Sequence, residues 1–357
     1  MIRVLFDGQV FSIHKRGGIA QVFYSVFQES RHFPAPDLSL RRGSLLSRYA
    51  QDKKSSRFKT PIYISGNVKA KIPLVINWFY LWFSPYQIVH STYYFRGYLW
   101  RRPGTKHVVT LHDMIPEDFP ELFPNGNPHF QKEAFLRDAD RIVCVSNYTM
   151  SRLNFYFPEL IHKATVIYSG VRIPQNIEFP VARCPTILYV GSREGYKDFN
   201  TLLRALPSVL DSNPDIQLLA VSDKDFSESE RSLIATLGLT GKVTRKELSD
   251  SELQLAYQTC CLTVVTSKVE GFGLPVIEAM VRGCPVVASD IPVFREISEN
   301  SFLPFRPGDA QDLALKIKAV LADPTSYEDL REKGREIAKQ YSWSNVLKSL
   351  HSLYREM

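Results

Sequence analysis

Residues 266–280 read Thr-Ser-Lys-Val-Glu-Gly-Phe-Gly-Leu-Pro-Val-Ile-Glu-Ala-Met and follow the apolar, β-rich run 262–265. This pattern predicts a strand, a glycine-rich loop and a helix that Pro275 opens, because proline in the first helical turn has no N–H to leave unsatisfied. Gly271 and Gly273 let the backbone approach a ligand closely. The free N–H groups at a helix start favour anionic oxygens, so the segment predicts a binding site for a group such as a diphosphate.

Two carboxylates belong to this segment. Glu270 lies in the loop and Glu278 lies one turn into the predicted helix, with seven residues between them. A carboxylate in either place accepts hydrogen bonds from the vicinal hydroxyls of a sugar or a ribose. An isolated junction of this kind also fits a capped helix with two solvated glutamates, so other motifs must decide between the two interpretations.

The same strand–helix alternation runs through the whole chain. It builds parallel sheets with helices on both faces, so we expect an α/β protein of two Rossmann-like, doubly wound domains. The expected strands are 3–6, 87–91, 107–111, 141–145 and 164–168 in the first half and 186–190, 217–221, 262–265 and 286–288 in the second. The expected helices include 18–29, 128–139, 199–210, 249–258 and 275–281.

The domain boundary is expected near 172–185, where three prolines interrupt the periodic pattern. We therefore expect an N-terminal Rossmann-like domain over 1–175 and a C-terminal Rossmann-like domain over 176–341. Residues 342–357 are expected to form a C-terminal helix, and packing of this helix against the first domain is one option. Ligands of such sheets bind at the C-terminal ends of the strands, so two domains that face each other would form a cleft.

The charge of the chain is uneven. Residues 1–175 hold 23 Lys and Arg against 12 Asp and Glu, whereas the whole chain has 44 against 37 and a net charge of +7. This asymmetry indicates an anionic partner of the first half, unless the basic surface serves solubility alone. Nucleic acid, an anionic membrane and a phosphorylated substrate are the candidates.

A cytoplasmic location is expected. The chain starts with a short strand that ends at a turn and not with a signal peptide. Its longest apolar stretch, 72–86, has about fifteen residues, whereas a spanning helix needs about 20. An odd number of cysteines without a Cys-x-x-Cys pair indicates buried, reduced thiols. They are Cys144, Cys184, Cys260, Cys261 and Cys284.

Three further loops contain candidate site residues. Arg193 and Lys197 follow the expected strand 186–190, where a guanidinium fork and a point charge can grip a pyrophosphate, although paired basic residues in loops are often only solvated. His112 and Asp113 follow strand 107–111, and a lone histidine at such a place is more often structural. The third loop, after the first strand, reads Lys15-Arg16-Gly17-Gly18, and its glycine pair would serve any tight turn.

Taken together, these motifs resemble the retaining glycosyltransferases of family 4, which have the GT-B fold. The carboxylates of 270–278 resemble the family's Glu-(seven residues)-Glu signature, and 288–297 is also similar. The resemblance spans most of the chain and is weakest over 31–86, where acceptor specificity is expected. One departure is Ser169-Gly170-Val171-Arg172, where many relatives have Asn-Gly-Val-Asp. This segment lies at the expected hinge.

The resemblance implies a role for each motif. Glu270 would contact the donor hexose and Glu278 the ribose, while Arg193 and Lys197 would bind the diphosphate. His112 would approach the donor near its anomeric carbon. Phe272, Gly273, Leu274, Gly17 and Gly18 would complete the donor site, and Asp113, Lys15 and Arg16 would serve the acceptor or shape the loops.

The activity implied is transfer of a hexose, with retention, from a nucleotide sugar to a hydroxyl of a glycan or lipid-linked acceptor in surface polysaccharide or lipopolysaccharide biosynthesis. The segment His-Asp-Met-Ile-Pro at 112–116 weakly favours GDP-mannose. We expect neither a cofactor nor an obligatory metal, because the nearest Asp-x-Asp, 138–140, precedes a strand instead of following one. A non-catalytic nucleotide-sugar-binding protein is the alternative, and no recognised motif supports nucleic-acid binding.

The region of weakest resemblance has its own character. Basic residues precede the stretch 72–86, which is rich in aromatic residues. Basic residues beside an aromatic amphipathic stretch fit an anionic membrane surface, so we expect peripheral docking on the inner face of the cell membrane. The alternative is that the aromatic residues are core and the charges are solvated. The basic residues are Arg41, Arg42, Arg48, Lys53, Lys54, Arg57, Lys59, Lys69 and Lys71.

Overall fold

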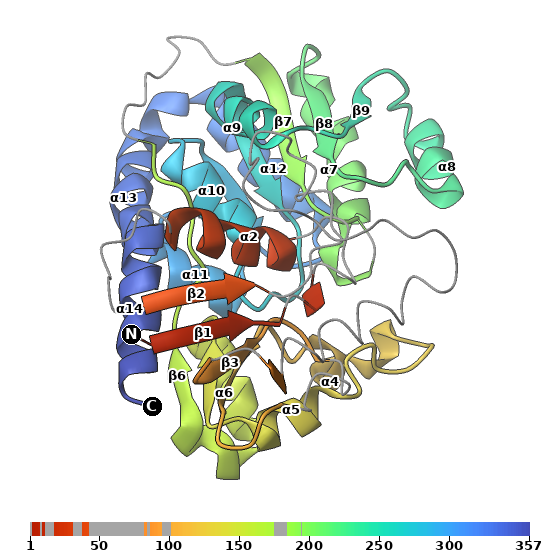
Figure 1. The fold of residues 1–357 in the computed structure, drawn as a ribbon. Coiled ribbons are helices and arrows are strands. Elements are labelled where there is room, and N and C mark those ends of the chain that lie inside the picture. Colours follow the sequence, from red (N-terminus) through yellow and green to blue (C-terminus); the bar gives the residue numbers. More distant parts are fainter. Residues whose placement is uncertain are drawn as a thin grey trace. The chain divides into compact units, whose positions relative to one another are not determined.

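The computed structural model divides into two compact units (Figure 1). The first comprises Met1–Gly170 and Trp343–Met357, and the second comprises Val171–Ser342. The chain thus passes into the second unit five residues earlier than we expected, and its last helix returns to the first unit. The residues that the structure describes are 2–7, 9–10, 18–30, 38–42, 82–83, 86–94, 101–174, 184–193 and 195–357.

The first unit contains a six-stranded parallel sheet in the order β2-β1-β3-β4-β5-β6, counted over the described residues. Its central strands are buried apolar runs, as fully covered parallel strands require. The strands are β1 Ile2–Phe6, β2 Leu38–Arg42, β3 Ile88–Ser91, β4 Lys106–Leu111, β5 Arg141–Cys144 and β6 Ala164–Val166. The helices are α2 Gly18–Ser30, α4 Ile115–Asp118, η4 Pro120–Leu122, α5 Lys132–Asp138, α6 Asn147–Tyr156, η5 Pro158–Lys163 and α14 Trp343–Arg355.

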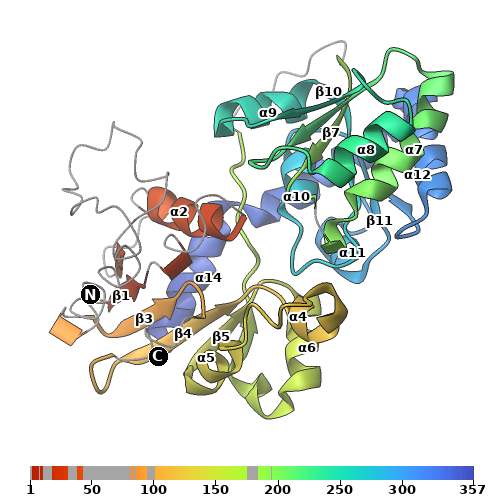
Figure 2. The same cartoon turned by 90° about the vertical axis from the view of Figure 1, so that its right-hand side faces the viewer.

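Side-chain alternation along β1 separates two cores in the first unit. Val4 and Phe6 pack on the face covered by α2 and α14, whereas Leu5 points to the face covered by α5 and α6. The C-terminal helix α14 lies beside α2 in this layer (Figure 2). Residues of the C-terminal helix α14 therefore complete the core around the first strand, β1.

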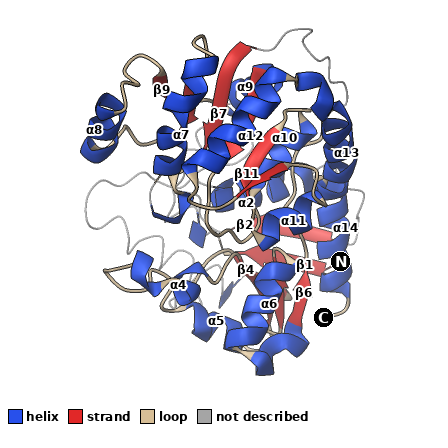
Figure 3. Ribbon diagram, turned by 180° about the vertical axis from the view of Figure 1, so that it is seen from behind, coloured by secondary structure: helices blue, strands red, loops and turns tan. Residues whose placement is uncertain are grey.

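The second unit is also built on a six-stranded parallel sheet, in the order β12-β11-β10-β7-β8-β9, counted in the same way. Helices flank its strands (Figure 3). The strands are β7 Cys184–Val190, β8 Gln217–Val221, β9 Val243–Lys246, β10 Cys260–Val265, β11 Val286–Ser289 and β12 Leu303–Phe305. The helices are η6 Gly195–Lys197, α7 Phe199–Ser212, α8 Glu228–Thr236, α9 Asp250–Thr259, α10 Leu274–Val281, α11 Pro292–Ser298, α12 Ala310–Ala322, η7 Pro324–Tyr327, α13 Glu328–Ala338 and η8 Lys339–Tyr341.

The direction of winding reverses once in each sheet. In the first unit the chain moves from β1 to β2 on one side and then returns to β3 on the other side of β1. In the second unit it moves outward through β7, β8 and β9 and then returns to β10, beside β7. Ligands of open α/β sheets bind beyond the C-terminal ends of the strands at such switch points. The loops after β1 and β3, and those after β7 and β10, are therefore where binding sites are expected.

Several expectations concern residues outside this description. Lys15, Arg16 and Gly17 lie outside it, as does most of the basic and aromatic region, including all residues of 43–81. Among the described residues, no helix is both long and apolar enough to cross a membrane. The five cysteines are free thiols, and Cys184 is exposed whereas the others are buried or partly buried.

Candidate functional site

Two hydrogen bonds join the loops that follow β7 and β10 in the second unit. The Lys268 N–H donates to the Tyr196 carbonyl oxygen at 2.8 Å, and Thr266 Oγ1 donates to the Lys197 carbonyl oxygen at 2.7 Å. These contacts hold the glycine-rich loop after β10 against the short helix η6. The two motifs that the sequence analysis singled out in this half therefore form one surface at the switch point.

At the centre of this surface, the Lys197 ammonium pairs with the Glu270 carboxylate. Ser267 Oγ donates a second hydrogen bond to the same oxygen, Glu270 Oε1, at 2.7 Å. Both charged side chains are largely covered, with 20% of Lys197 and 12% of Glu270 exposed. A charge pair of this kind can open to offer a cation to a phosphate and a carboxylate to a sugar hydroxyl.

The loop turns into α10 at Gly273, which has a φ of +108°. A side chain here would also be excluded sterically, because a Cβ atom would lie 2.5 Å from the Phe294 ring. The Phe272 ring is buried and meets the Tyr341 ring edge-on at 5.6 Å, so its backbone is the part left for a ligand. Helix α10 begins at Leu274, with Pro275 in its first turn, and its first N–H groups lie beside the loop.

Glu278 lies one turn into α10 and is partly buried. Its Oε2 accepts a hydrogen bond from the Tyr257 hydroxyl of α9 at 3.1 Å. Burial raises the pKa of Glu278 to about 7, although the Tyr257 hydrogen bond and the charge of Arg282 oppose this shift. The group therefore sits near its ionisation point at neutral pH and gains from any ligand that donates hydrogen bonds to the carboxylate.

Arg193 is held differently from the open loop residue that the sequence suggests. Its Nε donates to Glu230 Oε1 at 2.8 Å, and its Nη2 donates to the Asp225 carbonyl oxygen at 2.7 Å. The guanidinium also lies 4.9 Å from the centre of the Phe226 ring. Of the three guanidinium nitrogens of Arg193, only Nη1 is buried without a hydrogen-bond partner among the described residues. Glu230 fixes this arginine while it caps α8 through Ser227.

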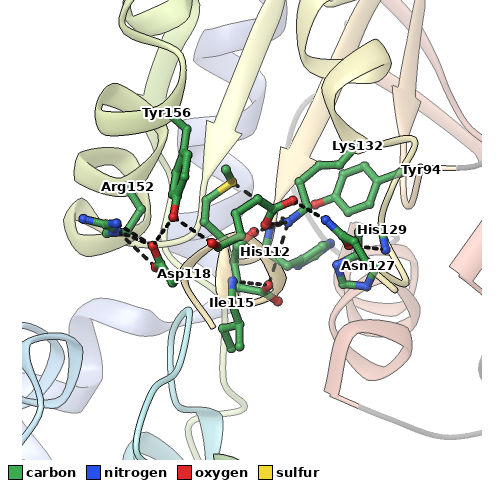
Figure 4. A network of polar contacts seen from close by, with 12 residues as sticks. Tyr94, His112, Ile115, Asp118, Asn127, His129, Lys132, Arg152 and Tyr156 are labelled. Carbon is green, nitrogen blue, oxygen red and sulfur yellow. Dashed lines mark hydrogen bonds and ion pairs between the residues drawn. The ribbon is translucent and has the colours of Figure 1, made fainter. Parts of the chain in front are cut away.

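In the first unit, His112 follows β4 directly, and its side chain is buried (Figure 4). Its backbone N–H donates to the Tyr94 hydroxyl at 3.2 Å. Its ring atom Nε2 is buried and has no hydrogen-bond partner among the described residues. Burial lowers the pKa of His112 to about 4, so the ring is neutral at physiological pH. A buried nitrogen without a partner is costly in a resting protein and is typical of a group that meets a ligand.

Asp113 turns the chain away from this strand. Its Oδ1 accepts a hydrogen bond from the Ile115 N–H at 3.1 Å and fixes the start of α4. Burial would raise the pKa of Asp113, but the charges of Lys132 and His129 and the bond from Ile115 outweigh it and lower the pKa. Asp113 is therefore an ionised residue that shapes the loop beside His112.

The other predicted residues are placed as follows. Gly18 is the first residue of α2, after the undescribed part of the loop that follows β1. Asp138 and Asp140 bind the ring and the backbone N–H of His107 at the start of β4, the sheet edge opposite His112. Within the described residues, no group of three or more His, Cys, Asp or Glu side chains is arranged to hold a metal ion.

Sequence reasoning missed several residues that hold the site. Ser267 lies inside the quoted motif, and the spacing Ser227-x-x-Glu230 is a capping-box signature that could have located α8. Asp7, at the end of β1, is buried at the switch point of the first unit and accepts hydrogen bonds from the N–H and hydroxyl of Thr92. Burial raises the pKa of Asp7. An aspartate directly after the first strand is the signal that could have found it.

The sequence matches the family described as Glycosyl transferases group 1 over residues 177–337 and the family described as Glycosyltransferase Family 4 over residues 37–174. The chain belongs to the group 1 glycosyltransferases. The protein is therefore a transferase, as expected. The two parallel sheets with their helices are those of the GT-B fold, which was also expected. The segment 270–278, on which the expected resemblance rested, lies within the matched range 177–337 and at the switch point of the second sheet.

Individual relatives support this assignment. An O-antigen chain mannosyltransferase of Salmonella typhimurium is 28% identical over 59% of this glycosyltransferase and 60% of its own length. O-antigen chain mannosyltransferase B of Escherichia coli is 25% identical over 70% of both chains. The crystal structure of HepE from Anabaena, in complex with UDP and glucose, superposes with a TM-score of 0.75 over the full length of both chains at 18% identity. At that identity the structure shows the shared fold alone.

Proposed function

We propose that this glycosyltransferase is a retaining enzyme that moves a hexose from a nucleoside-diphosphate sugar to a hydroxyl of a glycan or lipid-linked acceptor in surface polysaccharide biosynthesis. The observation that carries the proposal is the Lys197–Glu270 pair, with Glu278 one helical turn further on. These groups offer a cation for the diphosphate and one carboxylate each for the hexose and the ribose, which are the parts of a nucleotide sugar that need such partners.

The proposed reaction breaks the bond between the anomeric carbon and the diphosphate and forms a bond from the acceptor oxygen on the same face of the sugar. The acceptor proton passes to the leaving diphosphate oxygen. Lys197 and the first N–H groups of α10 would stabilise the charge that develops on the diphosphate. A neutral His112 would hydrogen-bond the sugar through Nε2. We assign the role of covalent nucleophile to none of the described side chains. Front-face attack is therefore the proposed route to retention.

The donor is proposed to be GDP-mannose. Two relatives with mannosyltransferase names support this choice, whereas the Anabaena neighbour binds UDP and glucose. A thermal-shift screen with GDP-mannose, UDP-glucose and UDP-N-acetylglucosamine, followed by NMR of the product anomer, tests the proposal. Stabilisation by a uridine donor alone would replace the mannose assignment, and an inverted anomer would refute retention.

We propose a metal-independent enzyme that acts in the cytoplasm at the inner face of the membrane. Equal turnover with and without EDTA tests metal independence. A protein that binds nucleotide sugars without catalysis is the competing proposal. It would bind the donor in calorimetry yet release no free sugar and form no product over hours.

A further inference from the structure

Lys132, the first residue of α5, is one of the most deeply buried charged side chains of the first unit, with 1% of its surface exposed. Its Nζ donates to Glu117 Oε2 at 2.7 Å and to the Asp113 carbonyl oxygen at 2.9 Å. A buried ammonium is costly unless it is paired and hydrogen-bonded, and replacing such a pair with apolar residues is often neutral. A stabilising role therefore does not by itself explain why this pair is buried, and its position suggests a role in function.

That position is beside the residue that follows His112, because Lys132 binds the Asp113 carbonyl oxygen. The chain is anchored on both sides of the His112–Asp113 peptide, because the Tyr94 hydroxyl accepts the His112 N–H while Lys132 binds the Asp113 carbonyl. Tyr94 is held in turn by donating to the Thr110 carbonyl oxygen at 3.0 Å. The His112 ring thus leaves a backbone segment that is anchored at the His112 N–H and at the Asp113 carbonyl (Figure 4).

The network extends from Lys132 to the loop after β3. Glu117 Oε1 accepts from Asn127 Nδ2 at 3.0 Å, and Asn127 Oδ1 accepts from the His129 N–H at 2.6 Å. The ring of His129 then meets the Tyr93 hydroxyl through Nε2 at 2.7 Å. The loops after β3 and β4 are in this way tied to each other at the sheet edge where His112 lies.

We propose that Lys132 and Glu117 are positioning residues of glycosyl transfer: their buried ion pair holds the Asp113 carbonyl and so fixes the direction in which His112 Nε2 meets the donor sugar. This inference rests on the proposed role of His112 at the reacting centre. It makes neither residue a ligand of the donor. Its consequence is that both act on turnover through the orientation of one ring.

A second ion pair to helix α4, made by Arg152 of α6, offers a matched control. Arg152 Nε donates to Asp118 Oδ1 and Oδ2 at 2.9 and 3.0 Å, so this second ion pair anchors α4 through the residue next to Glu117. Within the described residues, Arg152 interacts with Asp118 and with the rings of Phe155 and Tyr156, and with neither Asp113 nor His112. Arg152→Met therefore removes an anchor of α4 and leaves the support of His112 in place.

The experiment compares Lys132→Met, Glu117→Gln and Arg152→Met in the full chain by kcat, donor KM and melting temperature. Lys132→Met should lower kcat by about ten- to a hundredfold with little change in donor KM, since displacement of a reacting group by about 1 Å can cost this much. Glu117→Gln keeps the lysine and should lower kcat less. Arg152→Met should lower the melting temperature and keep kcat within about twofold of wild type. Folded Lys132→Met with wild-type kcat would overturn the inference, as would a loss in Arg152→Met as large as in Lys132→Met. If Lys132→Met fails to fold, Glu117→Gln decides by the same criteria.

A second readout is independent of catalysis. In ¹⁵N-histidine NMR spectra, with His112 assigned by its loss in His112→Asn, Lys132→Met should raise the pKa of His112, because a positive charge that lowers it is removed. The other charged groups that face the ring are Asp113, His129 and His90. A wild-type protein without transferase activity would refute the proposed function, and the His112 signal would still test the positioning. An unchanged His112 pKa together with unchanged chemical shifts of the His112 ring in Lys132→Met would overturn the positioning even in an active enzyme.

Discussion

Lys197 and Glu270 neutralise each other across two loops that lie 73 residues apart in the chain. Both were expected to contact the donor, one at the diphosphate and the other at the hexose. In the structure each is the other's partner, and Ser267 shares Glu270 Oε1. Donor binding would therefore exchange one internal ion pair for two ligand contacts. In the proposed function, the two charges would stay paired until a ligand of the right chemistry replaced the pair.

The first prediction concerns Lys197. Lys197→Met should raise the donor KM and also lower kcat, with a loss in kcat/KM of about a hundredfold, because the charge would meet both the bound diphosphate and the extra charge of the transition state. Lys268→Met is the matched control, since Lys268 lies in the neighbouring loop, is 53% exposed and pairs with Asp198 at 3.4 Å. Steady-state kinetics with varied donor check the prediction. Similar losses in both variants would show that loop charge in general, and not Lys197, serves the donor.

Glu278 leads to a prediction in which stability and binding change in opposite directions. Its pKa is about 7 in the folded protein, against 4.5 as the ordinary value. A carboxyl with a raised folded pKa takes up protons on folding between these values, so folding stability falls as pH rises from 4.5 to 7 and stays lower above pH 7. The cost at pH 8 is about 3 kcal/mol on the scale of 1.36 kcal/mol per pKa unit.

Glu278→Gln should therefore raise the stability of the ligand-free protein at pH 8 and leave it unchanged at pH 4. The same variant should weaken nucleotide binding, because the ribose loses a charged acceptor worth about 1.5–3 kcal/mol. Urea unfolding at the two pH values and calorimetry with the nucleotide measure the two effects. A variant that is less stable at pH 8, or that binds the nucleotide as tightly as wild type, contradicts the assignment of Glu278 as a ribose ligand kept at a cost to the fold.

The sequence predicts the strands around the switch points because each is rich in apolar, β-forming residues, such as Leu-Thr-Val-Val at 262–265 within β10. The edge strands β9 and β12 carry no such signal, since they read Val-Thr-Arg-Lys and Leu-Pro-Phe. The strand β2, Leu38–Arg42, reads Leu-Ser-Leu-Arg-Arg and was also not expected. Edge strands have a neighbour on one side only, so their residues need less apolar character than central ones.

Side-chain partners were predictable only where one loop contains them. The Glu270 and Glu278 spacing is visible in a single segment, but Glu230 lies 37 residues from Arg193 and Glu117 lies 15 residues from Lys132. Such pairs depend on which strands lie next to each other, and the sequence contains no direct record of that. This is why the sequence predicts a diphosphate contact for Arg193 and gives no sign of its buried pair with Glu230 of α8.

The burial of Arg193 gives a third prediction. The Arg193–Glu230 pair has side chains that are only 4% and 11% exposed, and breaking a buried pair leaves an uncompensated charge. Arg193→Met should therefore lower the free energy of unfolding by about 3 kcal/mol or more. Arg295→Met, which breaks the half-exposed pair with Asp290, should cost less than about 1 kcal/mol. Denaturant titration measures the free energy of unfolding of both variants. If both lose equally little stability, Arg193 can leave Glu230 at small cost and is available to bind the donor diphosphate.

His112 gives a fourth prediction, on turnover and pH. His112→Asn should lower kcat at saturating donor, and the wild-type profile should show no acid limb from this residue above pH 5, since burial holds the pKa of His112 at about 4. His107 is the control, because it lies at the other end of the same strand and its Nδ1 binds Asp138 at 2.7 Å. His107→Asn should lower the melting temperature and spare kcat. A wild-type limb near pH 6.5 that disappears in His112→Asn would show that the ring is charged in the active enzyme, against the burial seen in the structure.

The last prediction concerns the membrane and rests chiefly on the sequence. Residues 1–110 hold 17 Lys and Arg against 4 Asp and Glu. Much of this charge precedes the aromatic stretch 72–86, in which Trp82 and Phe83 are 39% and 67% exposed. Each basic residue near an anionic leaflet is worth about 1 kcal/mol, and the attraction fades within a Debye length. Several such residues with a shallow aromatic insertion are enough for reversible docking without a spanning helix.

We therefore expect the protein to sediment with vesicles rich in anionic lipid at low salt and to dissociate as salt rises. Charge reversal should weaken this binding at the positions beside the aromatic stretch more than an equal reversal elsewhere. The test variant combines Lys53→Glu, Lys54→Glu, Lys69→Glu and Lys71→Glu. The control variant reverses four exposed lysines of the second unit, Lys224→Glu, Lys246→Glu, Lys333→Glu and Lys339→Glu. Docking beside an anionic leaflet would bring the first unit close to a lipid-linked, phosphate-bearing glycan. Equal sedimentation with anionic and neutral vesicles at low salt would remove the reason to place the enzyme at the membrane, and a soluble glycan would then be the acceptor to test first.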